Sequence, residues 1–439
     1  NLSGVVHFYW ITGFERIKSG PGSDRRRLEK LKYNIVNSYK ITTPRRSSHI
    51  QMHQLHRCAF LQLRRFLRTP TTTKRTLHSS TTSNSPAVAP SLCKVDVIAH
   101  RGASGRMPDH TLETYKAAFE TGADWIELDA HSTLDGELVV NHDIELAETT
   151  DIEEWAWADT YRTRTIAPCF DGETHVMEGY MVSDFTLEQL KKLRVKMRHV
   201  ERSQEFNLQF QIPTVLETCN LLQSMIDDIR ASQSHEWKKS EWLEARNEYV
   251  LKHGVSRGNL NCGLYIETKR PGWYRSLGLP LEENLVKTVE DSNFTGPVIV
   301  QSFEMDSLRR IEEIKGEWPT VKLMTKEDVD ELMKEEGALD AYMSELCGLG
   351  INGIGPSKLS IIPDASNPPT TSVLVDTAHK YNLLVHPYTF KSDVMHLDRV
   401  YGGNASQEFG RFFELGVDGV FADFPGHGVF ARELYNRAR

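Results

Sequence analysis

Two histidines stand at the ends of short apolar runs of this chain: His100 in the run VIAHRG and, after one asparagine, His142 in the run VVNHD. Between them, Glu127 and Asp129 alternate with apolar residues in the run WIELDAH. An imidazole titrates near neutral pH and can exchange a proton with a reacting group, whereas paired carboxylates suit a hard divalent cation. These residue types together predict acid–base chemistry assisted by a metal ion.

Glu127 and Asp129 share one face of the strand predicted for 125–131, because side chains alternate between the two faces of a strand. At ~3.3 Å per residue the two carboxylates are about 7 Å apart along the strand, so that their oxygens can converge on one cation. The alternative is an exposed strand face with solvated acids, since an unpaired buried carboxylate is costly. The two nearby histidines favour the metal site.

A second acidic strand is predicted in the run GLYIETK, where Tyr265, Glu267 and Lys269 share one face. Glu267 can supply a third carboxylate to the cation, and Lys269 can face a phosphate oxygen. Arg101 offers a planar fork for two phosphate oxygens. A phosphodiester reacts readily only when a cation draws off charge, an acid serves the leaving alkoxide and a base serves the attacking hydroxyl. The residues supply each of these.

Strand-like runs alternate with helical patterns through residues 95–439. Eight strands are predicted, at 97–99, 125–131, 263–269, 297–303, 320–325, 350–355, 383–390 and 418–425. Alternating strands and helices favour a parallel sheet, and eight such units fit a closed (β/α)8 TIM barrel with its catalytic groups at the carboxyl ends of the strands. A doubly wound open sheet is the alternative, but no G-x-G-x-x-G follows the first strand.

Three helices are predicted near these strands. The first begins after a cap at Asp109 or Thr111 and ends at Gly122. Apolar periodicity predicts a second helix at 212–229, and the polar segment 232–258 reads as a solvated helix without an assigned function.

The charge of the chain is distributed unevenly. Between Glu29 and Asp96 there are twelve Lys or Arg residues and no acid, whereas from Asp96 onward there are 35 basic and 57 acidic residues. The acidic part is a poor nucleic-acid ligand, because phosphate contacts need clustered Lys and Arg. No run of 18 apolar residues exists, so no transmembrane helix is expected.

Residues 1–94 do not read as a folded domain. The stretch from Met52 is amphipathic and Arg-rich, and a Ser/Thr-rich tail without acids follows it. This profile is typical of a mitochondrial or plastid transit peptide, with a disordered basic tail as the alternative, and a cytoplasmic or secreted location stays open. The six cysteines form no C-x-x-C pair, so they indicate isolated thiols rather than a disulfide framework.

The motifs HRGASG, PDHT, GADWIELD and VVNHD occur in that order, and the chain thereby resembles the glycerophosphodiester phosphodiesterases. The resemblance extends from about residue 95 to the C-terminus. The later runs GIGPSK, VHPYTFKSD and FADFP resemble most closely the branch typified by bacterial periplasmic enzymes. One departure is Asp109, which stands where the family usually has Glu and is one methylene shorter.

The resemblance implies roles for individual residues. It makes His100 the base and His142 the acid of the reaction. Glu127, Asp129 and Glu267 would hold one divalent cation, with Ca²⁺ as the first choice and Mg²⁺ as the alternative. Two further groups are assigned by the same resemblance: the phosphate-binding residues Arg101 and Lys269, and the pocket residues His386, Tyr388 and Phe424, each of which could equally be a packing residue at the barrel mouth.

The resemblance also implies a subdomain inserted at about 134–211, after the second strand and beside the active site. A helix-like stretch is predicted within it at 185–195. Its aromatic residues Trp155, Trp157 and Tyr161 either line a pocket for the alcohol half of a substrate or form the small core of the insertion.

The implied function is metal-dependent hydrolysis of glycerophosphodiesters, such as glycerophosphocholine and glycerophosphoethanolamine, to sn-glycerol 3-phosphate and an alcohol. The attacking group is either water or the glycerol 2-hydroxyl. Three rivals are a lysophospholipase D-like activity on acylated substrates, a phospholipase C-like barrel and a catalytically silent barrel that binds phosphate esters. The partner is a small-molecule substrate, and the sequence does not determine the oligomeric state.

Overall fold

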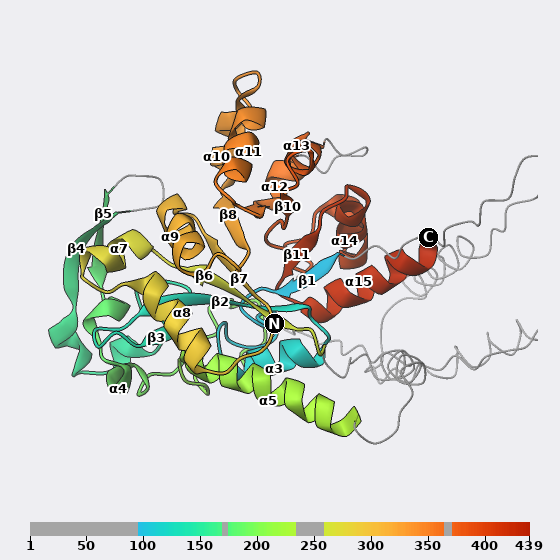
Figure 1. Ribbon diagram of the computed structural model, residues 1–439. Coiled ribbons are helices and arrows are strands. Elements are labelled where there is room, and N and C mark those ends of the chain that lie inside the picture. Colours follow the sequence, from blue (N-terminus) through green and yellow to red (C-terminus); the bar gives the residue numbers. More distant parts are fainter. Residues whose placement is uncertain (1–94, 169–173, 234–258, 364–370) are drawn as a thin grey trace, which may run out of the picture. The chain divides into compact units, whose positions relative to one another are not determined.

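A computed structural model describes residues 95–168, 174–233, 259–363 and 371–439 (Figure 1). The transit peptide predicted within residues 1–94 lies outside these ranges. So does the polar helix predicted for 232–258, apart from its first two residues.

Eight parallel strands surround the centre of the described structure (Figure 1). They are β1 (Asp96–Ala99), β2 (Trp125–Ser132), β6 (Gly263–Thr268), β7 (Val298–Ser302), β8 (Thr320–Met324), β9 (Gly353–Pro356), β10 (Leu384–Val385) and β11 (Gly419–Ala422). Their order is β10-β9-β8-β7-β6-β2-β1-β11. The barrel closes where the Phe421 N–H donates to the Pro387 carbonyl at 3.1 Å and the Asp418 N–H to the Val385 carbonyl at 3.0 Å. The predicted TIM barrel is confirmed.

Several strands are shorter than the sequence pattern predicts, and the strand expected at 418–425 is β11, of four residues. Two further cases have a local reason. The strand expected at 350–355 begins only at Gly353, because Gly350 has a left-handed φ of 81° that a strand does not accommodate. The strand expected at 383–390 is β10, of two residues. Pro387, which lacks an N–H, limits the hydrogen bonds that can extend it.

The centre of the barrel contains a cluster of buried side chains from five strands: Ile98, Tyr265, Ile299, Val321 and Phe421. The register of β2 and β6 continues this inward-facing row with acids, because Glu127 pairs with Tyr265 and Asp129 pairs with Glu267. All three carboxylates therefore face the barrel axis near the carboxyl ends of two neighbouring strands.

Helices follow the strands and surround the barrel (Figure 1). They are α3 (Leu112–Glu120), α5 (Val215–Gln233), α7 (Pro271–Ser276), α8 (Leu281–Asp291), α9 (Met305–Lys315), α10 (Lys326–Leu332), α11 (Ala338–Gly348), α12 (Lys358–Ile361), α13 (Leu374–Lys380), α14 (Ala405–Glu414) and α15 (Pro425–Ala438). Thr111 is the cap of α3, since its hydroxyl accepts from the Thr114 N–H at 3.2 Å. The second predicted helix is α5.

β3 (Leu138–Val140) pairs antiparallel with β2. Along the chain, a group of short elements follows between β3 and α5, and we call it the β3–α5 layer. Its elements are the short 3-10 helices η1 (Ile152–Glu154), η2 (Ala158–Tyr161) and η3 (Val182–Asp184), the hairpin of β4 (Thr163–Pro168) and β5 (Thr174–Gly179), and α4 (Leu187–Leu190). A further 3-10 helix, η4 (Arg399–Tyr401), precedes α14.

The aromatic residues of this layer pack against its own buried cluster. Trp155, Trp157 and Tyr161 contact it, and the Tyr161 and Phe185 rings lie 5.2 Å apart. Their contacts are those of a small core. The helix predicted for 185–195 is reduced to the four residues of α4. Beyond it, the Arg194 N–H donates to the Asp151 carboxylate at 2.7 Å instead of to a carbonyl of the preceding turn.

Within the described ranges, no helix combines the length and the apolar character needed to cross a membrane.

Candidate active site

Three carboxylates meet at the mouth of the barrel. One oxygen from each of Glu127, Asp129 and Glu267 lies within 4.8 Å of the others, and all three side chains are buried. Burial and the neighbouring Asp129 carboxylate raise the pKa of Glu127 well above its usual value. Burial likewise raises the pKa of Glu267 to about 7, against the opposing effect of Lys269. Such acids are stable as anions only when positive charge is placed among them.

The chemistry of this donor set fits a hard divalent cation. All of the donors are carboxylate oxygens, which Ca²⁺ and Mg²⁺ prefer. Among the described residues, Asp129 Oδ1 is buried and has no hydrogen-bond partner, although Lys269 Nζ lies 3.6 Å from it. A buried carboxylate oxygen without a partner is costly unless a ligand satisfies it.

Protein cations compensate only part of this negative charge. Lys269 Nζ lies 2.9 Å from Glu267 Oε1, and the backbone N–H of Arg101 donates to Glu127 Oε2 at 2.6 Å. Burial alone would raise the pKa of Asp129, but the Lys269 ammonium and His110 hold it well below its usual range. Lys269 and Arg101 are thus two cations that lie directly beside the three acids.

His100 is fixed by a carboxylate at the end of β1. Its Nδ1 lies 2.7 Å from Asp423 Oδ1, and Arg202 Nη2 lies 2.6 Å from Asp423 Oδ2. Burial and the Arg101 charge lower the pKa of His100 to about 4, so the ring is neutral near pH 7. Because the ionised Asp423 can only accept, Nδ1 carries the proton and Nε2 has the lone pair of a base.

His142 follows β3 after one residue. Its Nδ1 is 2.9 Å from Asp143 Oδ1, and a quarter of its side chain is exposed. Burial, then the charges of Arg101 and Lys269, lower its pKa to about 3. The ring therefore stands at an open face of the site in an electropositive surrounding.

Asp109 reaches its partners despite its shorter side chain. Its Oδ2 lies 3.1 Å from Arg101 Nη1 and 2.7 Å from Arg198 Nη2. These two guanidinium groups outweigh the effect of burial and hold the pKa of Asp109 well below its usual range. The carboxylate thereby orients Arg101 beside the acids.

Comparison with known proteins decides the family. The model of the glycerophosphoryl diester phosphodiesterase family matches residues 100–427. This chain belongs to that family. It is an enzyme, a phosphoric diester hydrolase.

Curated relatives agree over most of their length. Glycerophosphodiester phosphodiesterase GDPD6 of Arabidopsis thaliana is 32% identical over 340 residues, which cover 75% of this chain and 83% of the relative. The glycerophosphodiester phosphodiesterase of Haemophilus influenzae is 27% identical over 376 residues, covering 80% and 92%. A solved structure from Silicibacter pomeroyi shares the fold, with a TM-score of 0.51 at 19% identity over 79% of this chain and 94% of that chain.

The structure brings most of the predicted residues of this family member together, but not all. His386 is buried inside the barrel, where its Nδ1 lies 3.0 Å from the Tyr265 hydroxyl. The Tyr388 hydroxyl donates to the Met324 carbonyl at 3.0 Å. Phe424 stacks on His427 with a centroid distance of 5.2 Å. The first two contacts are hydrogen bonds within the protein and the third is ring stacking. The roles of these residues in a substrate pocket stay predictions.

The buried His386 predicts a pH dependence of stability. Burial lowers its pKa from 6.5 to about 4, so the unfolded chain takes up a proton before the folded one does as the pH falls. Stability is therefore complete above pH 6.5 and declines toward pH 4, by about 3 kcal/mol for this group. In urea unfolding, His386→Gln should lose less stability between pH 7 and 4.5 than the wild type. An equal loss in both proteins would contradict this.

Four site residues were not singled out from the sequence: His110, Arg198, Arg202 and Asp423. Asp423 directly follows β11, so the rule that placed His100 at a strand end could have found it. His110 lies within the PDHT motif. The two arginines come from the irregular segment after α4, where the sequence pattern carries no signal for their positions.

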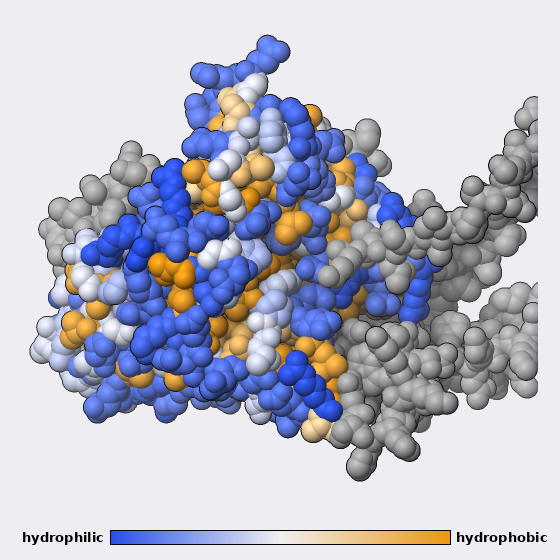
Figure 2. Space-filling view, in the orientation of Figure 1, coloured by the Kyte–Doolittle hydropathy of each residue, from blue (hydrophilic) through white to orange (hydrophobic). Residues whose placement is uncertain are grey.

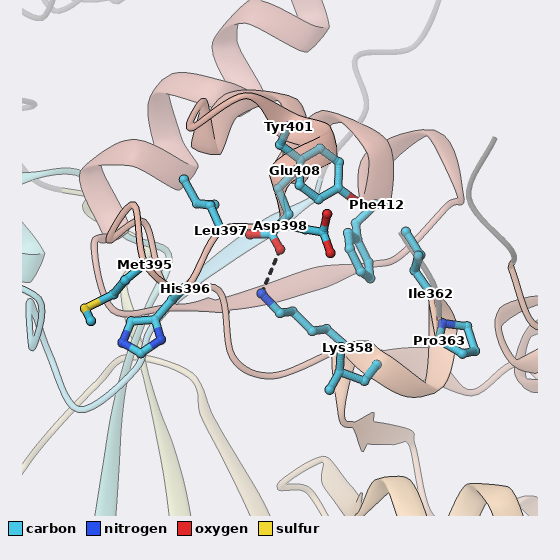
Figure 3. Close-up of a pocket in the computed structure, with 11 residues that line it drawn as sticks. Lys358, Ile362, Pro363, Met395, His396, Leu397, Asp398, Tyr401, Glu408 and Phe412 are labelled. Carbon is cyan, nitrogen blue, oxygen red and sulfur yellow. Dashed lines mark hydrogen bonds and ion pairs between the residues drawn. The ribbon is translucent and has the colours of Figure 1, made fainter. Parts of the chain in front are cut away.

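One pocket of the described structure lies away from the three clustered acids. Figure 3 shows it between α12 and α14, where Lys358 Nζ lies 2.7 Å from Glu408 Oε1. None of the three clustered acids or the two strand-end histidines lines this pocket. Figure 2 shows apolar residues scattered among polar ones over the visible face of the molecule. The site is therefore defined by its buried charges rather than by this hollow.

Proposed function

We propose that this enzyme hydrolyses glycerophosphodiesters, such as glycerophosphocholine and glycerophosphoethanolamine, to sn-glycerol 3-phosphate and a free alcohol with the help of a divalent cation. The observation that carries the proposal is the meeting of three buried carboxylates within 4.8 Å, at a barrel mouth that also holds two histidines. Membership of the family supports the substrate class.

Glu127, Asp129 and Glu267 would hold the cation, Ca²⁺ in the first place and Mg²⁺ as the alternative. A bound cation supplies a positive charge that stabilises the anionic oxygens of a phosphodiester. Arg101 and Lys269 contribute the fixed charges of the protein to the same group, and the guanidinium fork can bind two phosphate oxygens at once.

His100 is proposed as the general base. Its Nδ1–H is bound by Asp423, which orients the ring and stabilises the imidazolium that forms when Nε2 accepts a proton. The proton comes from water or from the glycerol 2-hydroxyl, and the contacts of His100 are compatible with both.

His142 is proposed as the general acid, which must carry a proton when the substrate is bound. Burial, and then the charges of Arg101 and Lys269, lower the pKa of His142. A phosphodiester anion between these cations offsets their charge and raises the pKa of His142. Substrate binding thus favours the protonated ring, which then donates to the departing alkoxide oxygen.

We propose that the predicted insertion at about 134–211 borders the alcohol half of the substrate. Support comes from its two arginines, which reach the site: Arg198 contacts Asp109 and Asp143, and Arg202 contacts Asp423. His386 and Tyr388 remain proposed pocket residues. A likeness to the bacterial periplasmic branch remains a proposal as well.

The proposed function is tested by assaying the purified chain on glycerophosphocholine, glycerophosphoethanolamine and lysophosphatidylcholine, each with Ca²⁺, Mg²⁺ or a strong chelator. Release of sn-glycerol 3-phosphate from the first two substrates, lost in chelator and restored by one cation, is expected. Full activity in chelator would contradict the metal requirement. Preference for lysophosphatidylcholine would favour the lysophospholipase D-like alternative instead.

We further propose that the basic segment 1–94 directs the enzyme to a mitochondrion or plastid. The composition of this segment alone supports the proposal. Imaging of a fluorescent fusion with and without residues 1–94 tests this, and an unchanged distribution would refute it.

A further inference from the structure

The histidine of the PDHT motif contacts one of the three acids directly. His110 Nε2 lies 2.8 Å from Asp129 Oδ2, and His110 Nδ1 lies 2.8 Å from the Tyr115 hydroxyl. His110 is 2% exposed and Asp129 is 1% exposed, so water does not compete for these bonds. The three groups form one buried chain that ends on a carboxylate of the site.

The chemistry of the partners fixes the direction of both hydrogen bonds. An ionised Asp129 can only accept, so His110 Nε2 must carry a proton. A neutral imidazole carries a proton on only one of its two nitrogens. Nδ1 is then the acceptor, and the Tyr115 hydroxyl must donate to it. Tyr115 thus selects the tautomer of His110 that binds Asp129.

The backbone holds His110 in this position. Its φ is 55°, in the left-handed region, and its N–H donates to the Arg101 carbonyl at 3.2 Å. Tyr115 lies in the first turns of α3 and is fully buried. His110 is therefore held between the loop after β1 and helix α3 while its ring reaches β2.

The result is an asymmetric Asp129 carboxylate. Oδ2 accepts from His110, whereas Oδ1 is the buried oxygen without a hydrogen-bond partner in the described part of the chain. The hydrogen bond to one oxygen restrains the rotation of the carboxylate, so its other oxygen is held in a preferred direction. Oriented ligands of this kind bind a metal more tightly than free ones.

We infer that His110 is a positioning residue that aims Asp129 at the cation, with Tyr115 fixing its tautomer. This inference rests on the proposed function, because it needs a cation among the three acids. His110 itself does not contact the cation in this scheme; it acts only through Asp129.

The dissociation constant for Mg²⁺ or Ca²⁺, measured by calorimetry on the metal-free full chain, tests the inference. His110→Leu, which keeps most of the volume, should raise this constant about 10–100-fold, the usual effect of removing an outer-shell partner. His110→Gln should recover part of the affinity, since its amide N–H can still donate to Asp129. The kcat of His110→Leu should rise toward the wild-type value as the cation is brought to saturation.

His131 offers a matched control. It is 1% exposed, and its Nδ1 lies 2.8 Å from the Tyr274 hydroxyl, but its hydrogen bond in the described structure runs to none of the three acids. His131→Leu removes a similar buried His–Tyr pair, so its stability loss should resemble that of His110→Leu. The cation affinity of His131→Leu should remain within about twofold of the wild type. This change is much smaller than the one expected when a hydrogen-bond partner of a metal ligand is removed.

Four outcomes would overturn the inference. The first is an unchanged cation affinity in folded His110→Leu, and the second is an equal loss in His131→Leu. If His110→Leu does not fold, Tyr115→Phe decides, because it should weaken cation binding in the same direction; an unchanged dissociation constant in this variant is the third outcome. The fourth, a wild type that binds no cation, would refute the proposed function itself and is recognised without any variant.

Discussion

His100→Ala is expected to lower kcat on glycerophosphocholine by about 10²–10⁴-fold, the usual share of a general base. The structure gives the physical reason: Asp423 binds Nδ1 at 2.7 Å and leaves Nε2 to accept a proton. Alanine removes both the base and its orientation while the barrel strands keep their hydrogen bonds. Circular dichroism and the melting temperature should therefore stay close to those of the wild type.

His142→Ala should show a loss of similar size with a different substrate dependence. A general acid matters most when the departing alcohol is a poor leaving group. A p-nitrophenyl phosphodiester, whose phenolate leaves without a proton, should thus recover most activity in His142→Ala but not in His100→Ala. Equal recovery in both variants would reverse or abolish the assignment of roles.

A surface histidine serves as the control for both variants. His379 is 40% exposed at its side chain and pairs with Asp418, just before β11 and at the far end of that strand from the site. His379→Ala should keep kcat within a factor of about two, far below the range of general acid–base catalysis. Near-normal activity in both His100→Ala and His142→Ala would mean that neither ring exchanges a proton in the reaction.

The second large effect is expected from the metal ligands. Asp129→Asn should weaken cation binding by more than about 10²-fold, because loss of a ligand charge exceeds the effect of an outer-shell change. Glu127→Gln and Glu267→Gln should act in the same direction. Excess cation should restore activity partly, since a neutral amide oxygen remains a donor. Calorimetry and titration of activity with Mg²⁺ and Ca²⁺ measure both properties.

Glu408→Gln is the matched control for these variants. Glu408 is also a buried acid, but it pairs with Lys358 in the pocket of Figure 3, outside the acid cluster. Its substitution should leave cation affinity unchanged. Loss of affinity in Glu408→Gln comparable to that in Asp129→Asn would show that the effect is not specific to the three acids.

The acid cluster could be predicted from the sequence because strand geometry is regular. The period of two placed Glu127 and Asp129 on one face, and the same rule placed Glu267 on the inward face of the next strand. Parallel neighbours then brought the three together, as the pairing of Asp129 with Glu267 shows. The eight strands followed from the same periodicity, although several are shorter than predicted, in two cases where glycine or proline interrupts the strand.

The groups that orient these acids could not be predicted in the same way. His110 reaches Asp129 from a loop with left-handed backbone, where no periodic rule applies. Arg198 and Arg202 come from irregular structure and depend on contacts made across many intervening residues. The helix expected at 185–195 failed for a related reason, since a tertiary bond from Asp151 replaced the local one.

A crystal of the full chain grown with Mn²⁺, as a scattering substitute for Mg²⁺, gives the most direct measurement of the central claim. We predict one anomalous peak within about 2.0–2.6 Å of carboxylate oxygens from Glu127, Asp129 and Glu267, the range for hard cations. A peak bound elsewhere, or none at a cation concentration that saturates activity, would contradict the account.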